Sequence, residues 1–229
     1  MLSVPIREVH ELELSSICNL ACVYCPHPML QREKAHIGLD TLERALLHVE
    51  HYCREGTQGE LSLTGIGEAI LHPSFGEALR MCREVIGASR LLVLATNGVD
   101  LTDDIAVLLQ KYGVMTFVSL HRPEVAGPAM ERLRKAGVYH SANHSFVDSA
   151  INWAGQVDWA VSAQSHACTY LSVGWAVVRQ NGGVDACCQD AHDLHPIGSV
   201  WDEPGSWMTH AIPLCKSCHF SVPANLQEA

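Results

Sequence analysis

Apolar and polar residues alternate over residues 9–14 (Val-His-Glu-Leu-Glu-Leu), and this pattern predicts a β-strand with two unlike faces. Further along, segments with helical spacing of apolar residues alternate with short apolar runs. Helices are expected at 40–56, 74–86, 102–112, 124–136 and 149–153. Strands are expected at 60–64, 91–95, 115–120, 138–146 and 157–162. Strand and helix therefore alternate about six times, which is typical of a parallel sheet covered by helices.

Two of the expected helices carry a start signal in the sequence. Asp40 stands three residues before Glu43, and Ser74 stands three residues before Glu77, which is the spacing of a capping box. We therefore expect the side chains of Asp40 and Ser74 to cap these helices.

The number of strand–helix units bears on the fold class. About six units do not complete the eight of a closed (β/α)8 barrel. We expect an α/β fold in which residues 1–165 form an open, partial (β/α)6 barrel. After residue 166 the helical spacing disappears and Cys, Gly, Pro and Trp dominate. Residues 166–229 are therefore expected to form a small Cys-rich domain, with too little core to fold without a metal or another staple.

Composition narrows the class of protein further. Of 229 residues, 48% are hydrophobic and 17% are charged, which indicates a folded globular chain. The net charge is -10 and no basic stripe is present, so nucleic-acid binding is not expected. No apolar run reaches the roughly 20 residues of a membrane-spanning helix, and the N-terminus lacks a secretory signal. We expect a cytoplasmic protein whose partner is a small-molecule or peptide substrate.

The chain has ten cysteines, and in a cytoplasmic protein such a count indicates metal sites or redox chemistry. Two of them, Cys53 and Cys82, fall on apolar helix faces and are expected to pack as small hydrophobic residues. The others form two groups, one with Cys18, Cys22 and Cys25, and one with Cys168, Cys187, Cys188, Cys215 and Cys218.

The first group places three thiolates in a short loop, Cys18-Asn-Leu-Ala-Cys22-Val-Tyr-Cys25, directly after the first strand. Three thiolates can hold three irons of a 4Fe–4S cluster and leave the fourth iron open. A zinc site is the alternative. Because structural zinc takes four ligands, His27 would have to complete it.

This triplet, with an aromatic residue just before its third cysteine, resembles the signature of the radical S-adenosylmethionine (SAM) superfamily. The resemblance implies that Tyr24 packs near the adenine of SAM. A second landmark of the family is a Gly-Gly-Glu-like turn whose backbone receives the SAM amino group. Here it is Gly65-Ile66-Gly67-Glu68, in which Ile66 departs from the pattern.

Three further positions fit the family pattern at the ends of the next strands: Thr96, Asn97 and Ser119. Relatives often contact the SAM ribose or carboxylate there, although ordinary turn chemistry would also explain these residues. The resemblance covers residues 9 to about 165. It implies that an electron from a donor such as flavodoxin or ferredoxin cleaves SAM, and that the resulting 5′-deoxyadenosyl radical removes a hydrogen atom from a substrate.

The second group resembles the SPASM/Twitch domains of radical SAM enzymes. Thirteen residues separate Cys168 from Gly182, four more precede Cys187, and a Cys-x2-Cys pair follows at 215–218. The shorter, one-cluster Twitch form fits best. It implies an auxiliary 4Fe–4S cluster held by Cys168, Cys187, Cys215 and Cys218, with a four-cysteine zinc site as the alternative. Cys188 is left over, and it could pack against the site, exchange with Cys187 or donate a hydrogen atom.

A catalytic base is harder to find in the sequence. In a parallel barrel, functional groups gather at the carboxyl ends of the strands. Polar residues expected at such positions include His121, Arg122, Asn143, His144, Gln164 and His166, of which the catalytic candidates are His121, Arg122, His144 and His166. Four other histidines are expected at the surface or in turns: His10, His48, His51 and His72.

The resemblance leaves three functional hypotheses. The first is oxidation of a small polar metabolite, because one-auxiliary-cluster relatives include a dehydrogenase of an aminocyclitol alcohol in which the second cluster accepts an electron. The second is modification of a ribosomal peptide or protein by crosslinking, epimerisation or oxidation. The third is a non-catalytic metal-binding module that has lost SAM chemistry.

Overall fold

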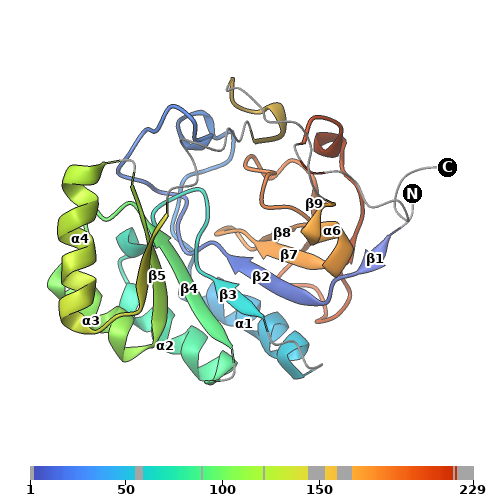
Figure 1. The fold of residues 1–229 in the computed structure, drawn as a ribbon. Helices are drawn as coiled ribbons and strands as arrows, with labels where there is room; N and C mark the ends of the chain where they lie inside the picture. The colour runs from blue at the N-terminus through green and yellow to red at the C-terminus, as the bar shows by residue number, and fades with distance from the viewer. Residues whose placement is uncertain are drawn as a thin grey trace.

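The computed structural model describes residues 3–54, 59–88, 90–120, 122–143, 153–158, 167–218 and 220. In this part of the chain, eight strands form one open sheet with the order β6-β5-β4-β3-β2-β7-β8-β9 (Figure 1). The strands are β2 (Glu8–Leu12), β3 (Glu60–Ser62), β4 (Leu91–Thr96), β5 (Val114–Ser119), β6 (His140–Asn143), β7 (Trp175–Val178), β8 (Gly183–Asp185) and β9 (Pro196–Ser199). A separate antiparallel pair joins β1 (Val4–Pro5) to β10 (Met208–Thr209).

Neighbouring strands from β6 through β2 to β7 all pair in parallel, and only the β7–β8 and β8–β9 pairs of the described sheet are antiparallel. The α/β class and the open, partial barrel are thus confirmed. In a parallel sheet all strands end at the same edge, so the loops that follow β2 to β5 meet there.

Four helices lie along one side of the sheet in Figure 1. They are α1 (Leu39–Arg54), α2 (Phe75–Ile86), α3 (Asp103–Lys111) and α4 (Pro123–Ala136). The side chains of Leu12 and Leu61 from the strands and of Leu42 and Leu79 from the helices are completely buried in one core. Burial of this apolar layer holds the sheet rigid, and the sheet in turn positions the loops at its carboxyl edge.

The helix starts differ in part from the capping-box predictions. α1 begins at Leu39, so Asp40 lies in its first turn and not at the cap. Ser74 is the N-cap of α2, but its side chain makes no capping hydrogen bond. Its backbone N–H instead donates to Nδ1 of His72 at 3.0 Å.

Two of the histidines expected at the surface or in turns are buried. His72 is held by a hydrogen bond between Nε2 and the carbonyl oxygen of Ile37, 2.8 Å away. His48 stacks on Trp207, with 3.9 Å between ring centres. Cys82 is completely buried in the core and Cys53 packs against it, as expected for small hydrophobic residues.

The strand next to β2 comes from an unexpected part of the chain. A strand was expected at 157–162, but Val157 and Asp158 are not in a strand, and residues 159–162 lie outside the described residues. β7 takes the parallel position beside β2. β7 follows the short helix α6 (Thr169–Val173). Its residues are all apolar, which is typical of a parallel strand that is covered on both faces.

Residues 166–229, which we expect to form a second domain, contribute β7, β8 and β9 to the same sheet as the barrel strands. The remainder of this region, as far as it is described, consists of loops, α6, β10 and the 3-10 helix η4 (Pro213–Lys216). No helix in the described ranges has the length and apolar character needed to cross a membrane.

Candidate functional site

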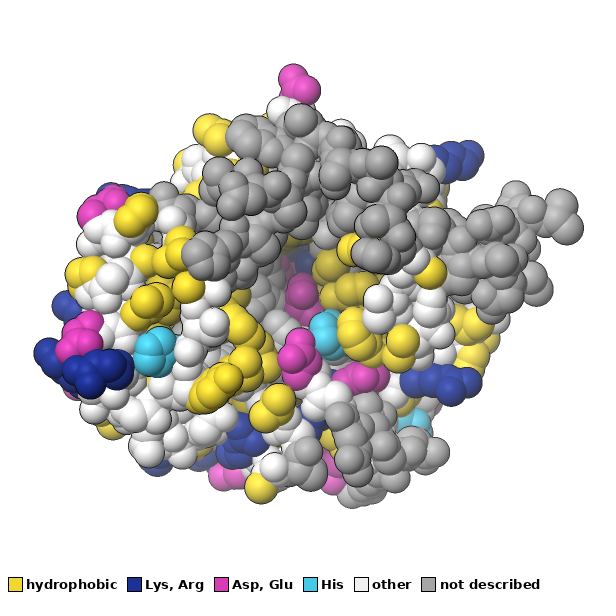
Figure 2. Space-filling model, viewed as in Figure 1, with side chains coloured by type: hydrophobic (Ala, Val, Ile, Leu, Met, Phe, Trp, Pro, Cys, Tyr) yellow, Lys and Arg dark blue, Asp and Glu magenta, His cyan; other side chains and the backbone are white. Residues whose placement is uncertain are grey.

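The loops at the carboxyl edge of the sheet enclose a cavity of about 490 Å³, which is in the size range of small-molecule sites. Figure 2 shows a hollow near the middle of this face, with acidic and hydrophobic side chains around it. Every residue predicted for the first cluster and for SAM lines this one cavity: Cys18, Cys22, Tyr24, Cys25, Gly65, Gly67, Glu68, Thr96, Asn97 and Ser119.

The cysteine loop is held to the end of β2 and to β4. Ser16 exchanges backbone and side-chain hydrogen bonds with Ala35, and this closes the base of the loop. The side-chain amide of Asn97 donates to Oδ1 of Asn19 at 2.8 Å and lies 3.9 Å from the sulfur of Cys18. The three cysteines are therefore presented from a fixed loop and not from a free segment.

The donor set and its protonation suit a bound metal cluster. Burial raises the pKa of Cys18, and it raises the pKa of Cys25 to about 11. Without a metal these thiols hold their protons at neutral pH. Because metal ligation needs thiolates, metal binding would release protons and would strengthen as the pH rises.

The zinc alternative for the first group has less support from the geometry. His27, which would have to complete a zinc site, is buried but does not line the cavity that holds the three cysteines. Within the described ranges, no group of three or more His, Cys, Asp or Glu side chains is placed to hold a single metal ion.

Both glycines of the Gly65–Glu68 turn are required by close approach of other atoms. A Cβ on Gly67 would lie 2.4 Å from the carbonyl oxygen of Ser15, and a Cβ on Gly65 would lie 2.3 Å from the side chain of Glu13. The turn is fastened to the end of β2, because the N–H of Glu68 donates to the carbonyl of Ile17 at 2.8 Å.

The carboxylate of Glu68 is the acidic group of this turn. Its Oε2 accepts the backbone N–H of Asn97 at 2.8 Å, whereas Oε1 is buried without a hydrogen-bond partner among the described residues. Burial raises the pKa of Glu68 to about 7. A cationic group in the cavity would stabilise the ionised form, so this site suits the ammonium group of an amino-acid-like cofactor.

The second group of cysteines lines a smaller cavity beside the first. Its walls include Cys168, Cys187, Cys188, Cys215 and Cys218, so the four predicted ligands and the left-over cysteine are brought together. Burial raises the pKa of Cys168 and of Cys215. None of the ten cysteines is in a disulfide.

Four of the described residues line both cavities: Tyr170, Cys188, Gln189 and Phe220. The Cys187 thiol donates to the sulfur of Cys188, which lowers the pKa of Cys188 to about 6 and raises that of Cys187. The side-chain amide of Gln189 lies 3.6 Å from the Cys188 sulfur. Cys188 therefore stands between the two cavities, facing both.

Glu11 is a cavity residue that the sequence analysis missed. It lines the large cavity, and burial raises its pKa well above the ordinary value. Its nearest cationic group is Nη1 of Arg179, 3.9 Å from Oε1, while Nε of the same arginine is bound to Asp185 at 2.5 Å. Alternation alone would put Glu11 on the same side of β2 as the buried Val9, and a register shift between these two residues changes that relation, so the sequence carried no clear signal for Glu11.

Other missed cavity residues are aromatic and come from the region after residue 150: Trp153, Tyr170, Trp175 and Phe220. The indole N–H of Trp153 donates to the backbone carbonyl of Tyr24 at 3.1 Å, which joins η3 (Trp153–Gly155) to the cysteine loop. No spacing in the sequence relates these residues to the first cysteine group, since tertiary contacts alone bring them there.

The catalytic candidates from the sequence have mixed placements. Arg122 is exposed at the start of α4, paired with Glu124 at 2.9 Å, and lines neither cavity. The other three candidates, His121, His144 and His166, lie outside the described residues.

The fold and the site together define a class of protein. An open parallel barrel carries a cysteine triplet and a glycine–glutamate turn at its carboxyl edge, around a cavity in the size range of small-molecule sites. Residues 12–125, about half of the chain, match the family model described as "Radical SAM superfamily". The chain belongs to the radical SAM superfamily, and this membership indicates an enzyme that uses SAM and a 4Fe–4S cluster.

Solved structures agree with this fold. A crystal structure of BtrN in complex with AdoMet (SAM) and 2-DOIA is 22% identical, covers 87% of this chain and 80% of its own, and has a TM-score of 0.67. A structure of native anSMEcpe with bound AdoMet is 16% identical, covers 85% and 78%, and has a TM-score of 0.62. No curated protein sequence matches the chain significantly.

Proposed function

We propose that this protein is a radical SAM dehydrogenase that oxidises a small polar metabolite and carries an auxiliary 4Fe–4S cluster as electron acceptor. In this proposal the barrel, residues 1–165, holds SAM, and residues 166–229 hold the auxiliary cluster. An external donor such as flavodoxin or ferredoxin supplies the electron for SAM cleavage, in the cytoplasm.

The observation that carries the proposal is the contact between the two cavities. Tyr170, Cys188, Gln189 and Phe220 line both of them. An electron acceptor held by the second cysteine group would therefore lie next to the space for the substrate. That adjacency suits an oxidation in which a substrate radical must lose an electron.

Each set of residues has a defined part in the proposal. Cys18, Cys22 and Cys25 would hold the first cluster, and Cys168, Cys187, Cys215 and Cys218 the second. When bound, SAM and the first cluster would supply a 5′-deoxyadenosyl radical, and the second cluster would supply an electron acceptor.

The protein binds, orients and shields the reacting groups. The Gly65–Glu68 turn would receive the SAM amino group, with Tyr24 beside the adenine and Thr96, Asn97 and Ser119 near its ribose or carboxylate. The aromatic side chains of Trp153, Tyr170 and Trp175 line the cavity and would exclude water from the reacting carbon.

The reaction balances for an alcohol substrate. One hydrogen atom leaves the carbinol carbon for the 5′-deoxyadenosyl group, one proton leaves the hydroxyl group, and one electron passes to the acceptor. The alcohol becomes a carbonyl compound, and methionine and 5′-deoxyadenosine are released.

The test uses anaerobically reconstituted protein with SAM and a chemical reductant. The small-molecule fraction and the peptide fraction of a cell extract are added separately, and 5′-deoxyadenosine and new products are measured by mass spectrometry. We expect the small-molecule fraction to stimulate 5′-deoxyadenosine formation and to yield a product lighter by two hydrogens. The Cys187→Ser variant should still make 5′-deoxyadenosine but lose the oxidised product.

Two outcomes would contradict the proposal. Stimulation by the peptide fraction alone would support the peptide-modifying alternative, and a structure of anSMEcpe with a bound peptide has a related fold (TM-score 0.60). Absence of 5′-deoxyadenosine under all conditions, with iron bound, would favour a non-catalytic metal-binding module.

A further inference from the structure

A buried ion pair lies behind the SAM-binding turn, between Glu13 and Arg32. Their side chains are 0% and 6% exposed, and Nη2 of Arg32 is 2.8 Å from Oε1 of Glu13. Glu13 follows β2, and Arg32 lies beyond the last cysteine of the loop. Neither side chain lines the large cavity, so the pair cannot touch a substrate there.

The carboxylate of Glu13 connects three separate segments. Oε1 also accepts the backbone N–H of Ile66 at 2.9 Å, and Oε2 lies 3.4 Å from the backbone N of Gln180. Ile66, the residue of the Gly65–Glu68 turn that departs from the family pattern, is therefore the one whose N–H donates to this carboxylate. Gly65 packs so closely on Glu13 that a Cβ there would clash.

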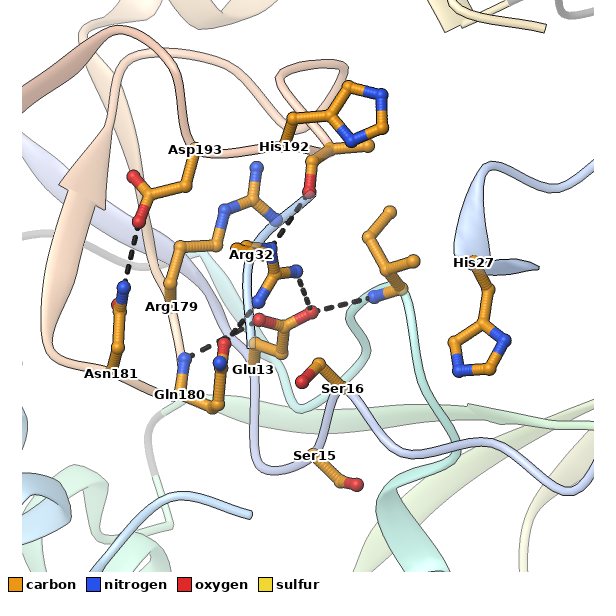
Figure 3. Close-up of polar contacts among 12 residues, drawn as sticks. Glu13, Ser15, Ser16, His27, Arg32, Arg179, Gln180, Asn181, His192 and Asp193 are labelled. Atoms are coloured by element: carbon orange, nitrogen blue, oxygen red, sulfur yellow. Dashed lines mark hydrogen bonds and ion pairs between the residues drawn. The ribbon is translucent and has the colours of Figure 1, made fainter. Parts of the chain in front are cut away.

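Arg32 makes a second set of connections, which Figure 3 shows together with those of Glu13. Its Nη1 donates to the side-chain oxygen of Gln180, and its Nε donates to the carbonyl of Ala191 at 2.8 Å. The side-chain amide of Gln180 donates to the carbonyl of Glu33 at 2.9 Å. The guanidinium fork thus joins the cysteine loop to the region that carries Cys187 and Cys188.

We propose that Glu13, Arg32 and Gln180 form a positioning network that sets the SAM-binding turn relative to the first cluster loop and ties both to the auxiliary-cluster region. This inference rests on the proposed SAM site. Arg32 holds the Glu13 carboxylate in place, and the same carboxylate oxygen accepts the Ile66 N–H, which fixes the backbone that would receive the SAM amino group. Loss of the charge would loosen the turn without removing any cluster ligand.

The chain offers a matched control on the same strand. Glu8 and Arg90 form another buried ion pair, 7% and 1% exposed, with 2.5 Å between Oε1 and Nη2. Arg90 also donates to the backbone carbonyls of Val9 and Glu60. This pair lies at the start of β2 and lines neither cavity, and Oε2 of Glu8 accepts the indole N–H of Trp175 at 3.0 Å. Glu8→Gln therefore tests the stability cost of neutralising such a pair away from the SAM-binding turn.

The experiment compares reconstituted wild type, Glu13→Gln and Glu8→Gln. Iron content, melting temperature, the SAM dissociation constant and the electron paramagnetic resonance spectrum of the reduced protein with and without SAM are measured. We expect both variants to melt at lower temperature and to keep the wild-type iron content. Only Glu13→Gln should bind SAM about tenfold more weakly, which corresponds to about 1.4 kcal/mol, and show a smaller spectral change on SAM addition.

Gln180→Ala is the second variant, because it removes the contacts of Gln180 with Arg32 and Glu33 while leaving the Glu13 charge. It should also weaken SAM binding, and it decides the question if Glu13→Gln does not fold. If the folded Glu13→Gln and Gln180→Ala variants bind SAM as tightly as Glu8→Gln does, the inference is wrong and the proposed function is unaffected. A wild type that binds iron but not SAM would overturn both.

Discussion

Gly67 and Ser15 lie so close together that a single added carbon would not fit between them. A Cβ on Gly67 would stand 2.4 Å from the Ser15 carbonyl oxygen and 2.6 Å from the carbonyl oxygen of Ile17. These are backbone atoms of the segment that follows β2 and leads into the cysteine loop, and they cannot move aside as a flexible side chain can. The close approach of the two segments therefore depends on glycine.

Replacement of Gly67 by alanine should push the Gly65–Glu68 turn away from β2. We expect Gly67→Ala to lower the free energy of unfolding by roughly 1–3 kcal/mol, as overpacking does, and to abolish most SAM binding. Urea denaturation and equilibrium dialysis with SAM measure these effects.

Gly127→Ala is the control, because Gly127 is inside α4 and a Cβ at this position would have no atom outside the local helix within 4 Å. That change should leave SAM binding unchanged, and any effect on stability should stay local to α4, where Gly127 precedes Pro128 and a Cβ before a proline is disfavoured in a helix. Equal SAM affinity in the two variants would show that the Gly67 contact has no part in binding.

The neighbouring cysteines 187 and 188 should differ in their effect on iron content. Cys187→Ser should reduce about eight irons to about four, because it removes a proposed ligand of a four-iron cluster. Cys188→Ser should keep about eight irons, since four other cysteines line the same cavity. Iron and sulfide analysis after anaerobic reconstitution measures both. If only Cys188→Ser loses iron, then Cys188 and not Cys187 is the ligand of the second cluster.

Glu11 should act on substrate and not on SAM. Among the described residues its side chain makes no hydrogen bond, only an approach of 3.9 Å to Arg179, and the residue lines the large cavity. A hydrogen bond to a charged group is worth about 1.5–3 kcal/mol, so Glu11→Gln should lower kcat/KM for the substrate about tenfold or more. Formation of 5′-deoxyadenosine without substrate should not change. An unaltered kcat/KM, with the exposed Glu77→Gln as reference, would contradict a substrate contact.

His10 should make stability depend on pH in the acid range. Its ring stacks on Trp175, 3.8 Å between centres, and burial lowers its pKa from 6.5 to about 4. The unfolded chain therefore binds a proton between these values while the folded protein does not. Stability from this residue is complete above pH 6.5 and is lost as the pH falls towards 4, by roughly 3 kcal/mol.

The measurement is chemical denaturation of wild type and of His10→Phe from about pH 7.5 to about pH 4, which spans the two pKa values. Phenylalanine keeps the ring stacked on Trp175 but cannot take up a proton. The wild type should lose stability relative to the variant as the pH falls. Parallel curves would mean that His10 titrates normally in the folded protein.

Local patterns in the sequence were sufficient for the barrel and for the first site. Periodicity and short apolar runs predicted β2 to β5 and α1 to α4, because both kinds of pattern are visible within a single stretch of residues. The cysteine triplet and the glycine turn were found because their chemistry depends on short spacing along the chain. All of their residues line one cavity.

Local patterns failed where the contact partner lies far away in the chain. β7 pairs with β2 across more than half of the sequence, so its apolar run carried no sign of a parallel partner. The caps expected from Asp40 and Ser74 did not form. Asp40 lies within the first turn of α1, and the Ser74 N–H that the Glu77 side chain would accept in a capping box donates to His72.

The class of chemistry follows from the sequence alone, because thiolates in a short loop and glycines in a tight turn act through local geometry. Three relationships are visible only in the folded protein: Glu11 lines the large cavity, Cys188 lines both cavities, and Glu13 joins Ile66 to Arg32. Such relationships depend on packing between segments distant in sequence. A buried charge is stable only where all of its partners meet, and that meeting point exists only in the folded chain.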